Sequence, residues 1–210
     1  MTTILIVDDH PPLRLALRVQ LSALVGVQTV LEADNGQAAV EAVRRHKPDL
    51  VVLDLDIPRI SGLDVAPRLR TIHPDVRILV FSAQDPDLFA ARAWQAGAQG
   101  FVSKTQDMTA FLRCVESVMT GYTVFPNGKH PVPVSTEPSA DEDDGMRRLS
   151  DKEVMVLQML ARGMSNKAIG AAMFISNKTV SSYKTRIMAK LRAESLVDLI
   201  DYARRCRLAP

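Results

Sequence analysis

Residues 50–58 read Leu-Val-Val-Leu-Asp-Leu-Asp-Ile-Pro, a short run of leucine and valine side chains that ends on an aspartate. Residues 4–9, Ile-Leu-Ile-Val-Asp-Asp, have the same arrangement near the start of the chain. Short continuous apolar runs are typical of strands that are buried on both faces, as in a parallel sheet. Both segments are therefore predicted to be inner strands that lead into acidic side chains.

The rest of residues 1–120 alternates similar apolar runs with stretches of helical period. Strands are predicted at 4–7, 27–31, 50–53, 78–81 and 100–102, and helices at 12–24, 36–45, 62–71, 87–95 and 108–119. Strict alternation of strands and helices is typical of an α/β fold, whose functional crevice lies at the C-terminal ends of the strands. We predict a doubly wound, five-stranded parallel sheet of the flavodoxin-like type for residues 1–120.

Residues 148–210 predict a second, small all-α domain of four helices. Ser150 and Glu153 form a Ser-x-x-Glu capping box, which marks the start of the first of these helices. The second and third helices are separated only by a brief turn near residues 173–175. This spacing matches the helix-turn-helix plan, in which the second helix of the pair enters the major groove of DNA.

The segment between the two domains, residues 121–147, predicts a flexible linker because the helical period is lost and prolines and acidic residues are frequent. The net charge of the whole chain is +2. It is distributed unevenly, with −2 on residues 1–120, −4 on residues 121–146 and +8 on residues 147–210. A basic C-terminal domain suggests a polyanionic partner such as nucleic acid.

Composition excludes several other classes of protein. The two cysteines, Cys114 and Cys206, belong to no Cys/His cluster, so neither a disulfide framework nor a zinc site is predicted. No apolar run approaches the ~20 residues that cross a bilayer, and the N-terminus does not read as a signal peptide. The expected location is therefore the cytoplasm.

An acidic pocket is predicted where the first and third strands end. Asp8, Asp9 and Asp54 would converge there, and their mutual repulsion favours a hard divalent cation, for which we predict Mg²⁺. Ser82 and Lys104 follow the fourth and fifth strands and add a hydroxyl and an ammonium to the same rim. This combination suits phosphoryl transfer, with Asp54 as the nucleophile.

These residues, at these spacings, resemble the receiver domain of two-component response regulators. The resemblance implies that Asp54 accepts a phosphoryl group from a sensor histidine kinase and becomes an aspartyl phosphate, aided by Ser82 and Lys104. It also implies that Mg²⁺ is held by Asp9, Asp54 and the main-chain carbonyl of Asp56, with Asp8 assisting. Phe101 falls where the family places an aromatic residue that switches together with Ser82.

The C-terminal domain resembles the LuxR-type helix-turn-helix. The two halves together resemble the NarL/FixJ class, and short sequence motifs resemble those of its BvgA/EvgA-like subgroup. The resemblance implies double-stranded promoter DNA as a partner, a homodimer after phosphorylation, and RNA polymerase as a further partner. Val180, Ile187 and Leu191 are predicted to face the core. The residues expected to contact DNA are Lys178, Thr179, Ser181, Ser182, Lys184, Thr185 and Arg186.

Two alternatives remain open from the sequence. Asp54-Leu55-Asp56 imitates the paired aspartates of haloacid-dehalogenase-like phosphohydrolases, although that family usually places the pair on its first strand and adds a lid domain. A regulator that binds DNA without phosphate is the second alternative. Our prediction is that the chain is not an enzyme beyond its own phosphorylation and dephosphorylation.

Overall fold

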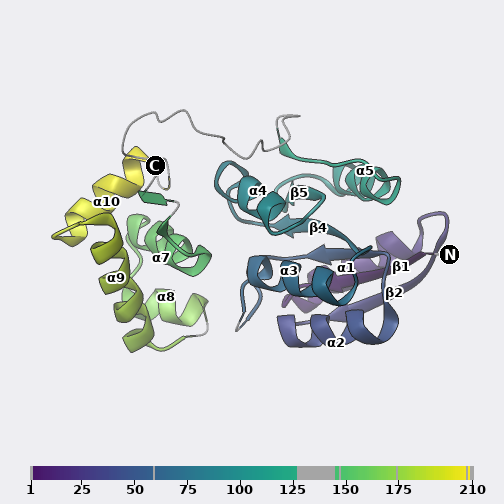
Figure 1. Ribbon diagram of the computed structural model, residues 1–210, viewed down its shortest axis with the longest axis horizontal. Coiled ribbons are helices and arrows are strands. Elements are labelled where there is room, and N and C mark those ends of the chain that lie inside the picture. The colour runs from purple at the N-terminus through teal and green to yellow at the C-terminus, as the bar shows by residue number, and fades with distance from the viewer. Residues whose placement is uncertain are drawn as a thin grey trace. The chain divides into compact units, whose positions relative to one another are not determined.

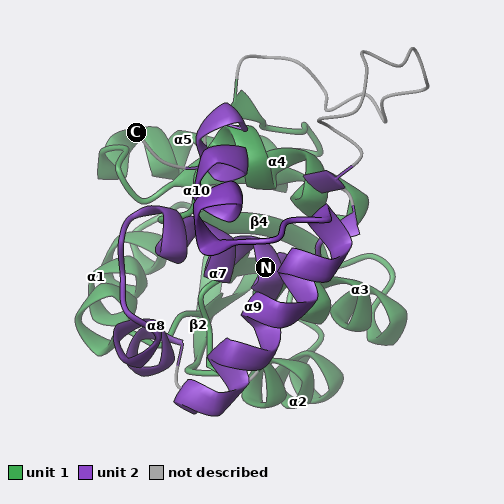
Figure 2. Cartoon of the chain, turned by 90° about the vertical axis from the view of Figure 1, so that its left-hand side faces the viewer, with its two compact units in different colours: residues 1–135 green, residues 136–210 purple. Residues whose placement is uncertain are grey.

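The computed structural model describes residues 2–58, 60–126, 145–146, 148–173, 175–206 and 208. The chain divides into two compact units, residues 1–135 and 136–210, which Figure 2 colours separately. Most of the predicted linker, at 127–144 and 147, lies outside the described residues. The first residues of that segment belong to the N-terminal unit, because Val124 exchanges backbone hydrogen bonds with Gln99 and Phe101.

The N-terminal unit contains a five-stranded sheet in the order β2-β1-β3-β4-β5, with every neighbouring pair parallel (Figure 1). The strands are β1 (Thr2–Val7), β2 (Val27–Ala33), β3 (Leu50–Leu53), β4 (Arg77–Ser82) and β5 (Gly100–Ser103). The helices are α1 (Pro11–Ser22), α2 (Gly36–His46), α3 (Gly62–Ile72), α4 (Pro86–Gln95) and α5 (Met108–Met119). The predicted fold is confirmed, since each predicted element is present.

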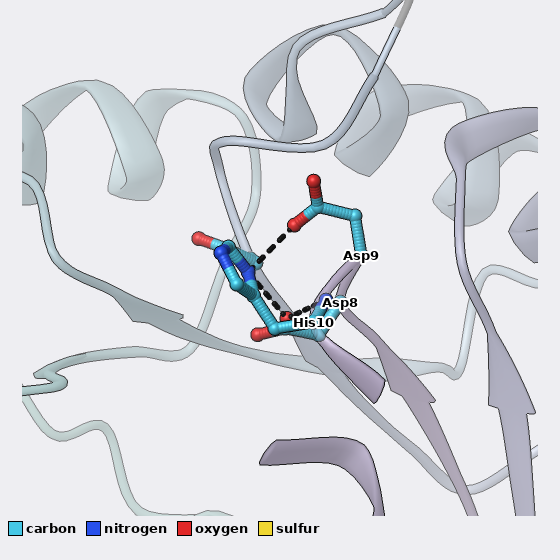
Figure 3. Close-up of side chains that lie close together, drawn as sticks. Asp8, Asp9 and His10 are labelled. Carbon is cyan, nitrogen blue, oxygen red and sulfur yellow. Dashed lines mark hydrogen bonds and ion pairs between the residues drawn. The ribbon is translucent and has the colours of Figure 1, made fainter. Parts of the chain in front are cut away.

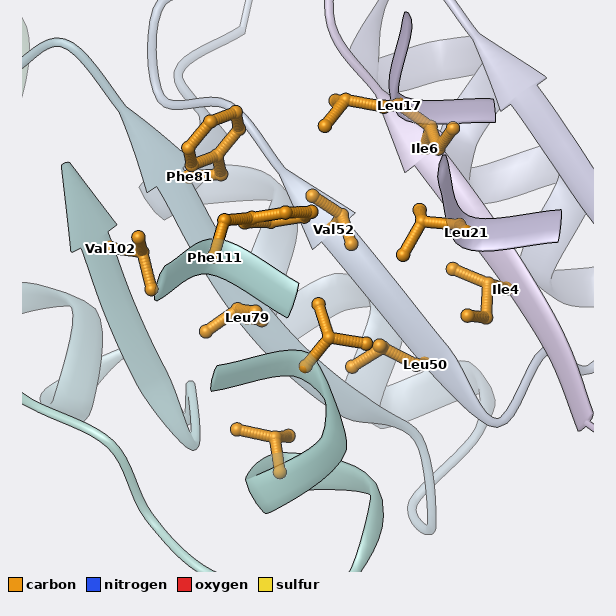
Figure 4. Packing of buried hydrophobic residues seen from close by; sticks show 12 residues of the cluster. Ile4, Ile6, Leu17, Leu21, Leu50, Val52, Leu79, Phe81, Val102 and Phe111 are labelled. Atoms are coloured by element: carbon orange, nitrogen blue, oxygen red, sulfur yellow. The ribbon is translucent and has the colours of Figure 1, made fainter. Parts of the chain in front are cut away.

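One face of this sheet packs against α1 and α5 (Figure 4). Phe81 of β4 and Phe111 of α5 meet there with ring centroids 4.5 Å apart. Leu5 and Val51, which point to the other face, are also fully buried. Burial on both faces explains the continuous apolar runs, because neither side of an inner strand tolerates a polar side chain.

Strand register sets the position of the acidic residues. Val7 of β1 lies opposite Leu53 of β3, so Asp8 and Asp54 leave the sheet at the same level. The amide of Asp54 donates to the carbonyl of Val7 at 2.9 Å. The loop after Asp54 then folds back so closely that a Cβ on Gly62 would collide with the carbonyl of Asp54, which explains the glycine at the start of α3.

The described part of the C-terminal unit contains the four predicted helices. They are α7 (Asp151–Ala161), α8 (Asn166–Ala172), α9 (Asn177–Leu191) and α10 (Leu196–Arg205). Ser150 and Glu153 form the predicted capping box at the start of α7. Among the described residues, no helix is long and apolar enough to cross a membrane.

Candidate functional site

The acidic residues meet at the C-terminal edge of the sheet. Asp8 and Asp54 are each only 2% exposed, and Figure 3 shows Asp8 and Asp9 beside His10 at the end of β1. Single oxygens of the three carboxylates and a ring nitrogen of His10 all lie within 4.8 Å of one another. The structure thus brings together the three aspartates that the sequence placed in one pocket, and it adds an imidazole.

Lys104 is the cation that faces these carboxylates. Its Nζ lies 2.6 Å from Asp54 Oδ2 and 2.7 Å from Asp8 Oδ2. Burial raises the pKa of Asp54, and the nearby charge of Asp8 adds to this shift while Lys104 opposes it. Burial acts to lower the pKa of Lys104, but Asp54 and Asp8 outweigh burial and the pKa is raised. The ammonium therefore stays charged and holds two anions that would otherwise repel each other.

The predicted switch residues lie on the neighbouring strands β4 and β5. Ser82 at the end of β4 is fully buried, and its carbonyl accepts the backbone N–H of Lys104 at 2.9 Å. Phe101 of β5 is 2% exposed. Ser82 pairs with Ser103, the residue before Lys104, so Ser82 and Lys104 leave adjacent strands at the same level of the sheet.

Gln84 belongs to the pocket although the sequence analysis did not single it out. Its Nε2 donates to both carboxylate oxygens of Asp56, at 2.7 and 2.8 Å. Burial, followed by the charge of Asp54, raises the pKa of Asp56 to about 6. Gln84 follows Ser82 by two positions, so its place at the rim of the sheet was a signal that could have revealed it.

Arg14 is the second residue that sequence reasoning missed. Its guanidinium donates to the main-chain carbonyl of Asp8 at 2.7 Å and to Glu32 Oε2 on β2 at 3.2 Å. Arg14 therefore ties the segment that carries Asp8 and Asp9 to the neighbouring strand. Its position one turn into α1 gave no sign of this contact, because only the fold brings that turn over the end of β1.

The residues present fit a divalent cation. Asp9 Oδ1 is buried and receives no hydrogen bond from the described residues, although His10 Nδ1 lies 2.8 Å away as an electrostatic neighbour. Among the residues that the structure describes, Asp8, Asp9 and Asp54 bring three carboxylates to this site, and Lys104 is the ammonium that contacts two of them. An orphaned buried carboxylate oxygen and a surplus of negative charge are what an oxygen-preferring ion such as Mg²⁺ relieves.

The second candidate site is the outer face of α9. Val180 and Ile187 are fully buried and Leu191 is half-buried, as predicted, so the opposite face is turned away from the core. The predicted contact residues that are exposed are Lys178, Ser181, Ser182, Thr185 and Arg186, whereas Thr179 and Lys184 are half-buried. Thr179 takes part in the N-terminal cap of the helix, because its amide donates to Ser176 Oγ.

An ion pair between an exposed lysine and a buried carboxylate links this helix to α7. Lys190 Nζ of α9 lies 2.6 Å from Glu153 Oε2 of α7, whose side chain is 3% exposed. The same oxygen accepts the backbone N–H of Ser150 at 2.7 Å and its hydroxyl at 2.9 Å. Burial acts to raise the pKa of Glu153, but the hydrogen bonds from Lys190 and Ser150 outweigh it and the pKa is lowered.

Comparison with known proteins identifies both halves of the chain. Residues 4–116 match the response regulator receiver domain, and residues 147–203 match the bacterial regulatory proteins of the luxR family. The chain therefore belongs to the response regulators, and within them to the NarL/FixJ class.

Full-length relatives share this organisation. The chain is 47% identical over 208 residues to a Pseudomonas aeruginosa protein named as a transcriptional regulator, covering 99% of this chain and 100% of that one. It is 45% identical to BvgA of Bordetella pertussis, named as a positive transcription regulator of virulence factors, with 98% of each chain covered. A structure of RcsB from Salmonella enterica serovar Typhimurium has the same fold, with a TM-score of 0.61 and 22% identity over 96% of this chain and 97% of that one.

Proposed function

We propose that this response regulator accepts a phosphoryl group on Asp54 and, in that state, dimerises and binds promoter DNA through α9. The observation that carries the first part is the position of Lys104 Nζ, 2.6 Å from Asp54 and 2.7 Å from Asp8. An ammonium at that position is already placed to neutralise the oxygens of a phosphoryl group bonded to Asp54.

The chemistry follows from the pocket. A carboxylate oxygen of Asp54 attacks the phosphorus atom of a phosphohistidine on the sensor kinase. A P–O bond forms while the P–N bond breaks, and the electron pair of that bond stays on the histidine nitrogen. Lys104 then turns from the Asp54 carboxylate to a phosphoryl oxygen, and the hydroxyl of Ser82 donates to another.

Asp9, Asp54 and the carbonyl of Asp56, with Asp8 assisting, would hold Mg²⁺, which when bound neutralises charge on the phosphoryl oxygens. Arg14 keeps Asp8 in place through its carbonyl during this change. The new group brings ~1.5 to 2 negative charges into the pocket. We expect the added charge to favour a minor conformer of the receiver in which Phe101 repacks behind Ser82.

The DNA-binding half of the proposal is supported by charge and by the relatives. Residues 147–210 carry the basic surplus of the chain, and Lys178 and Arg186 are exposed on α9. The solved RcsB structure was obtained bound to a promoter in the presence of a phosphomimetic. In a dimer, two copies of α9 would enter major-groove sites roughly 10 base pairs apart. RNA polymerase is a further expected partner at a promoter.

The first test is intact-mass analysis after incubation with acetyl phosphate. Wild type should gain one phosphoryl group only when Mg²⁺ is present, and Asp54→Ala should gain none. A matched control is Asp49→Ala, which removes a carboxylate from the opposite end of β3 and should leave the adduct unchanged. Absence of an adduct in wild type would instead favour a regulator that works without phosphate.

A second test separates signalling from turnover. The paired aspartates of a phosphohydrolase would release phosphate from a small phosphate ester in rapid steady turnover, whereas this receiver should carry at most one phosphoryl group per chain and release phosphate only as its aspartyl phosphate hydrolyses. DNA binding is then measured by fluorescence anisotropy with and without the phosphodonor. Wild type should bind more tightly with the donor, and Asp54→Asn should not respond.

A further inference from the structure

The outer face of α9 carries a narrow set of side chains, which we call the outer stripe. It consists of Lys178, Ser182, Thr185 and Ala189 at positions i, i+4, i+7 and i+11, all of them exposed. The stripe lies directly opposite Val180 and Ile187, which are buried in the core of the unit. If α9 enters a groove of DNA, as the proposed function requires, these four side chains are the ones that point furthest into it.

The hydroxyls of the stripe have already used their only hydrogen. Ser182 Oγ donates to the carbonyl of Lys178 at 3.1 Å, and Thr185 Oγ1 donates to the carbonyl of Ser181 at 3.1 Å. A hydroxyl has one donor hydrogen and two acceptor lone pairs. While these intrahelical bonds persist, Ser182 and Thr185 present only acceptors to a partner.

Ser181 differs from its neighbours. Its hydroxyl donates to the carbonyl of Asn177 at 3.1 Å and also accepts from Asn166 Nδ2 of α8 at 3.2 Å. Ser181 therefore joins the two helices of the helix-turn-helix and has less capacity left for a base. Of these three hydroxyls, those of Ser182 and Thr185 keep both acceptor lone pairs for a base.

The major groove distinguishes bases by donors, acceptors and the thymine methyl group. Adenine presents the donor N6 amino group and cytosine the donor N4 amino group, whereas guanine presents only the acceptors O6 and N7. A hydroxyl that donates to guanine must first leave its carbonyl within the helix, which costs about two- to tenfold in affinity. A hydroxyl that accepts from an amino group keeps that bond.

Apolar groups of the stripe distinguish adenine from cytosine, the two bases that present an amino group in the major groove. Thr185 carries a γ-methyl group and Ala189 is a methyl group one turn further along the exposed face. Thymine offers a methyl group in the major groove, and the G·C pair has none. We propose that Ser182 and Thr185 read adenine–thymine pairs, accepting from the adenine N6 amino group while the methyl groups of Thr185 and Ala189 contact thymine.

The experiment starts from the full chain treated with phosphodonor and a randomised duplex library. Affinities for the preferred duplex are then measured by anisotropy, with single adenines replaced by purine, which lacks the amino group, or by 7-deazaadenine, which lacks the N7 acceptor. At one or two positions purine should weaken binding by about three- to tenfold, whereas 7-deazaadenine should have no effect. Uracil in place of the facing thymine should weaken binding by about threefold through loss of the methyl contact.

Variants assign the effect to the side chains. Each variant, Ser182→Ala or Thr185→Val, lacks one of the two hydroxyls. At the base position which that hydroxyl contacts, the variant should bind the duplex with adenine and the duplex with purine equally tightly. The matched control is Ser117→Ala on α5, whose hydroxyl donates to the Arg113 carbonyl in the same manner but lies in the receiver unit, and it should keep the full discrimination.

The opposite pattern overturns the inference. If 7-deazaadenine weakens binding and purine does not, the hydroxyls act as donors. Tight binding without enrichment of any sequence, or a preferred duplex with G·C pairs at every sensitive position, also overturns it while leaving DNA binding intact. Failure to bind any duplex would count against the proposed function itself, so the two failures are distinguishable.

Discussion

Each compact unit places a lysine ammonium against a buried carboxylate, and the surroundings of the two pairs differ. In the receiver unit, Lys104 faces two buried carboxylates, Asp54 and Asp8. In the described part of the C-terminal unit, Lys190 faces one carboxylate, that of Glu153, which also accepts two hydrogen bonds from Ser150. The pKa of Asp54 is raised and that of Glu153 is lowered.

The opposite directions of these shifts separate a binding site from a structural pair. A carboxylate with a lowered pKa is stabilised as an anion by the fold itself, so it contributes to stability. A carboxylate with a raised pKa is destabilised as an anion by its surroundings, and a ligand that supplies positive charge removes that destabilisation. An ion pair with a buried carboxylate is therefore weak evidence of function by itself. The balance of charge around the carboxylate is what distinguishes a ligand-binding site from a structural ion pair.

The largest expected effect is the loss of Lys190. In Lys190→Met, Glu153 stays buried without its cation, and the C-terminal unit should lose about 2 to 3 kcal/mol. Urea unfolding followed through the methyl resonances of Val180 and Ile187, both fully buried in this unit, measures the loss. Adding Glu153→Gln should recover part of it, because glutamine keeps the capping box without the charge. A double variant less stable than Lys190→Met would contradict the structural role of the pair.

The receiver pocket should respond in the opposite direction when a carboxylate is removed. Without divalent cations, Asp54→Asn should stabilise the receiver unit by about 1 to 2 kcal/mol, because one of two facing buried anions is neutralised. Fluorescence of Trp94 in α4 reports unfolding of this unit. Mg²⁺ should erase the difference by stabilising wild type.

A matched control lies at the other end of the same strand. Asp49 accepts the backbone N–H of Thr3 at 2.7 Å, so Asp49→Ala should destabilise the receiver with or without Mg²⁺. If Asp54→Asn and Asp49→Ala changed the stability of the receiver in the same way, the two ends of β3 could not be distinguished as functional and structural.

The dependence on pH should distinguish the two pairs as well. Because the pKa of Glu153 is lowered, its contribution to stability is present above its ordinary value of 4.5 and is lost as the pH falls through the lowered value. The C-terminal unit should therefore weaken in acid, and Glu153→Gln should flatten the profile measured through the same methyl resonances. A wild-type profile that matches Glu153→Gln would be evidence that the ion pair does not form.

The smallest effect should come from an exposed ion pair. Arg45 and Glu41 lie four residues apart on α2 at 3.3 Å, with both side chains about two-thirds exposed. Glu41→Gln should change the stability of the receiver by less than about 0.5 kcal/mol in Trp94 fluorescence, because water and salt screen the pair. A larger change would mean that burial of the carboxylate does not determine how strongly the ion pairs of Lys104, Lys190 and Arg45 affect stability.

Much of the candidate site could be predicted because its residues occupy strand ends. Asp8, Asp54, Ser82 and Lys104 each follow an apolar run, and parallel strands bring their C-terminal ends to one edge. Arg14 could not be predicted, since its partner is a main-chain carbonyl that carries no mark in the sequence. The contact of Gln84 with Asp56 is also a product of how two loops approach each other.

The sequence by itself determined the order of strands and helices, the two compact units, the capping box at Ser150 and the basic C-terminal half, because period, cap residues and charge are local properties. Only the tertiary structure decided that Lys104 is shared by two carboxylates, that Lys190 reaches Glu153, and that Asn166 of α8 donates to the hydroxyl of Ser181 on α9. These features depend on side chains meeting within about 3 Å, the range of a hydrogen bond, and that distance is set by packing rather than by spacing along the chain.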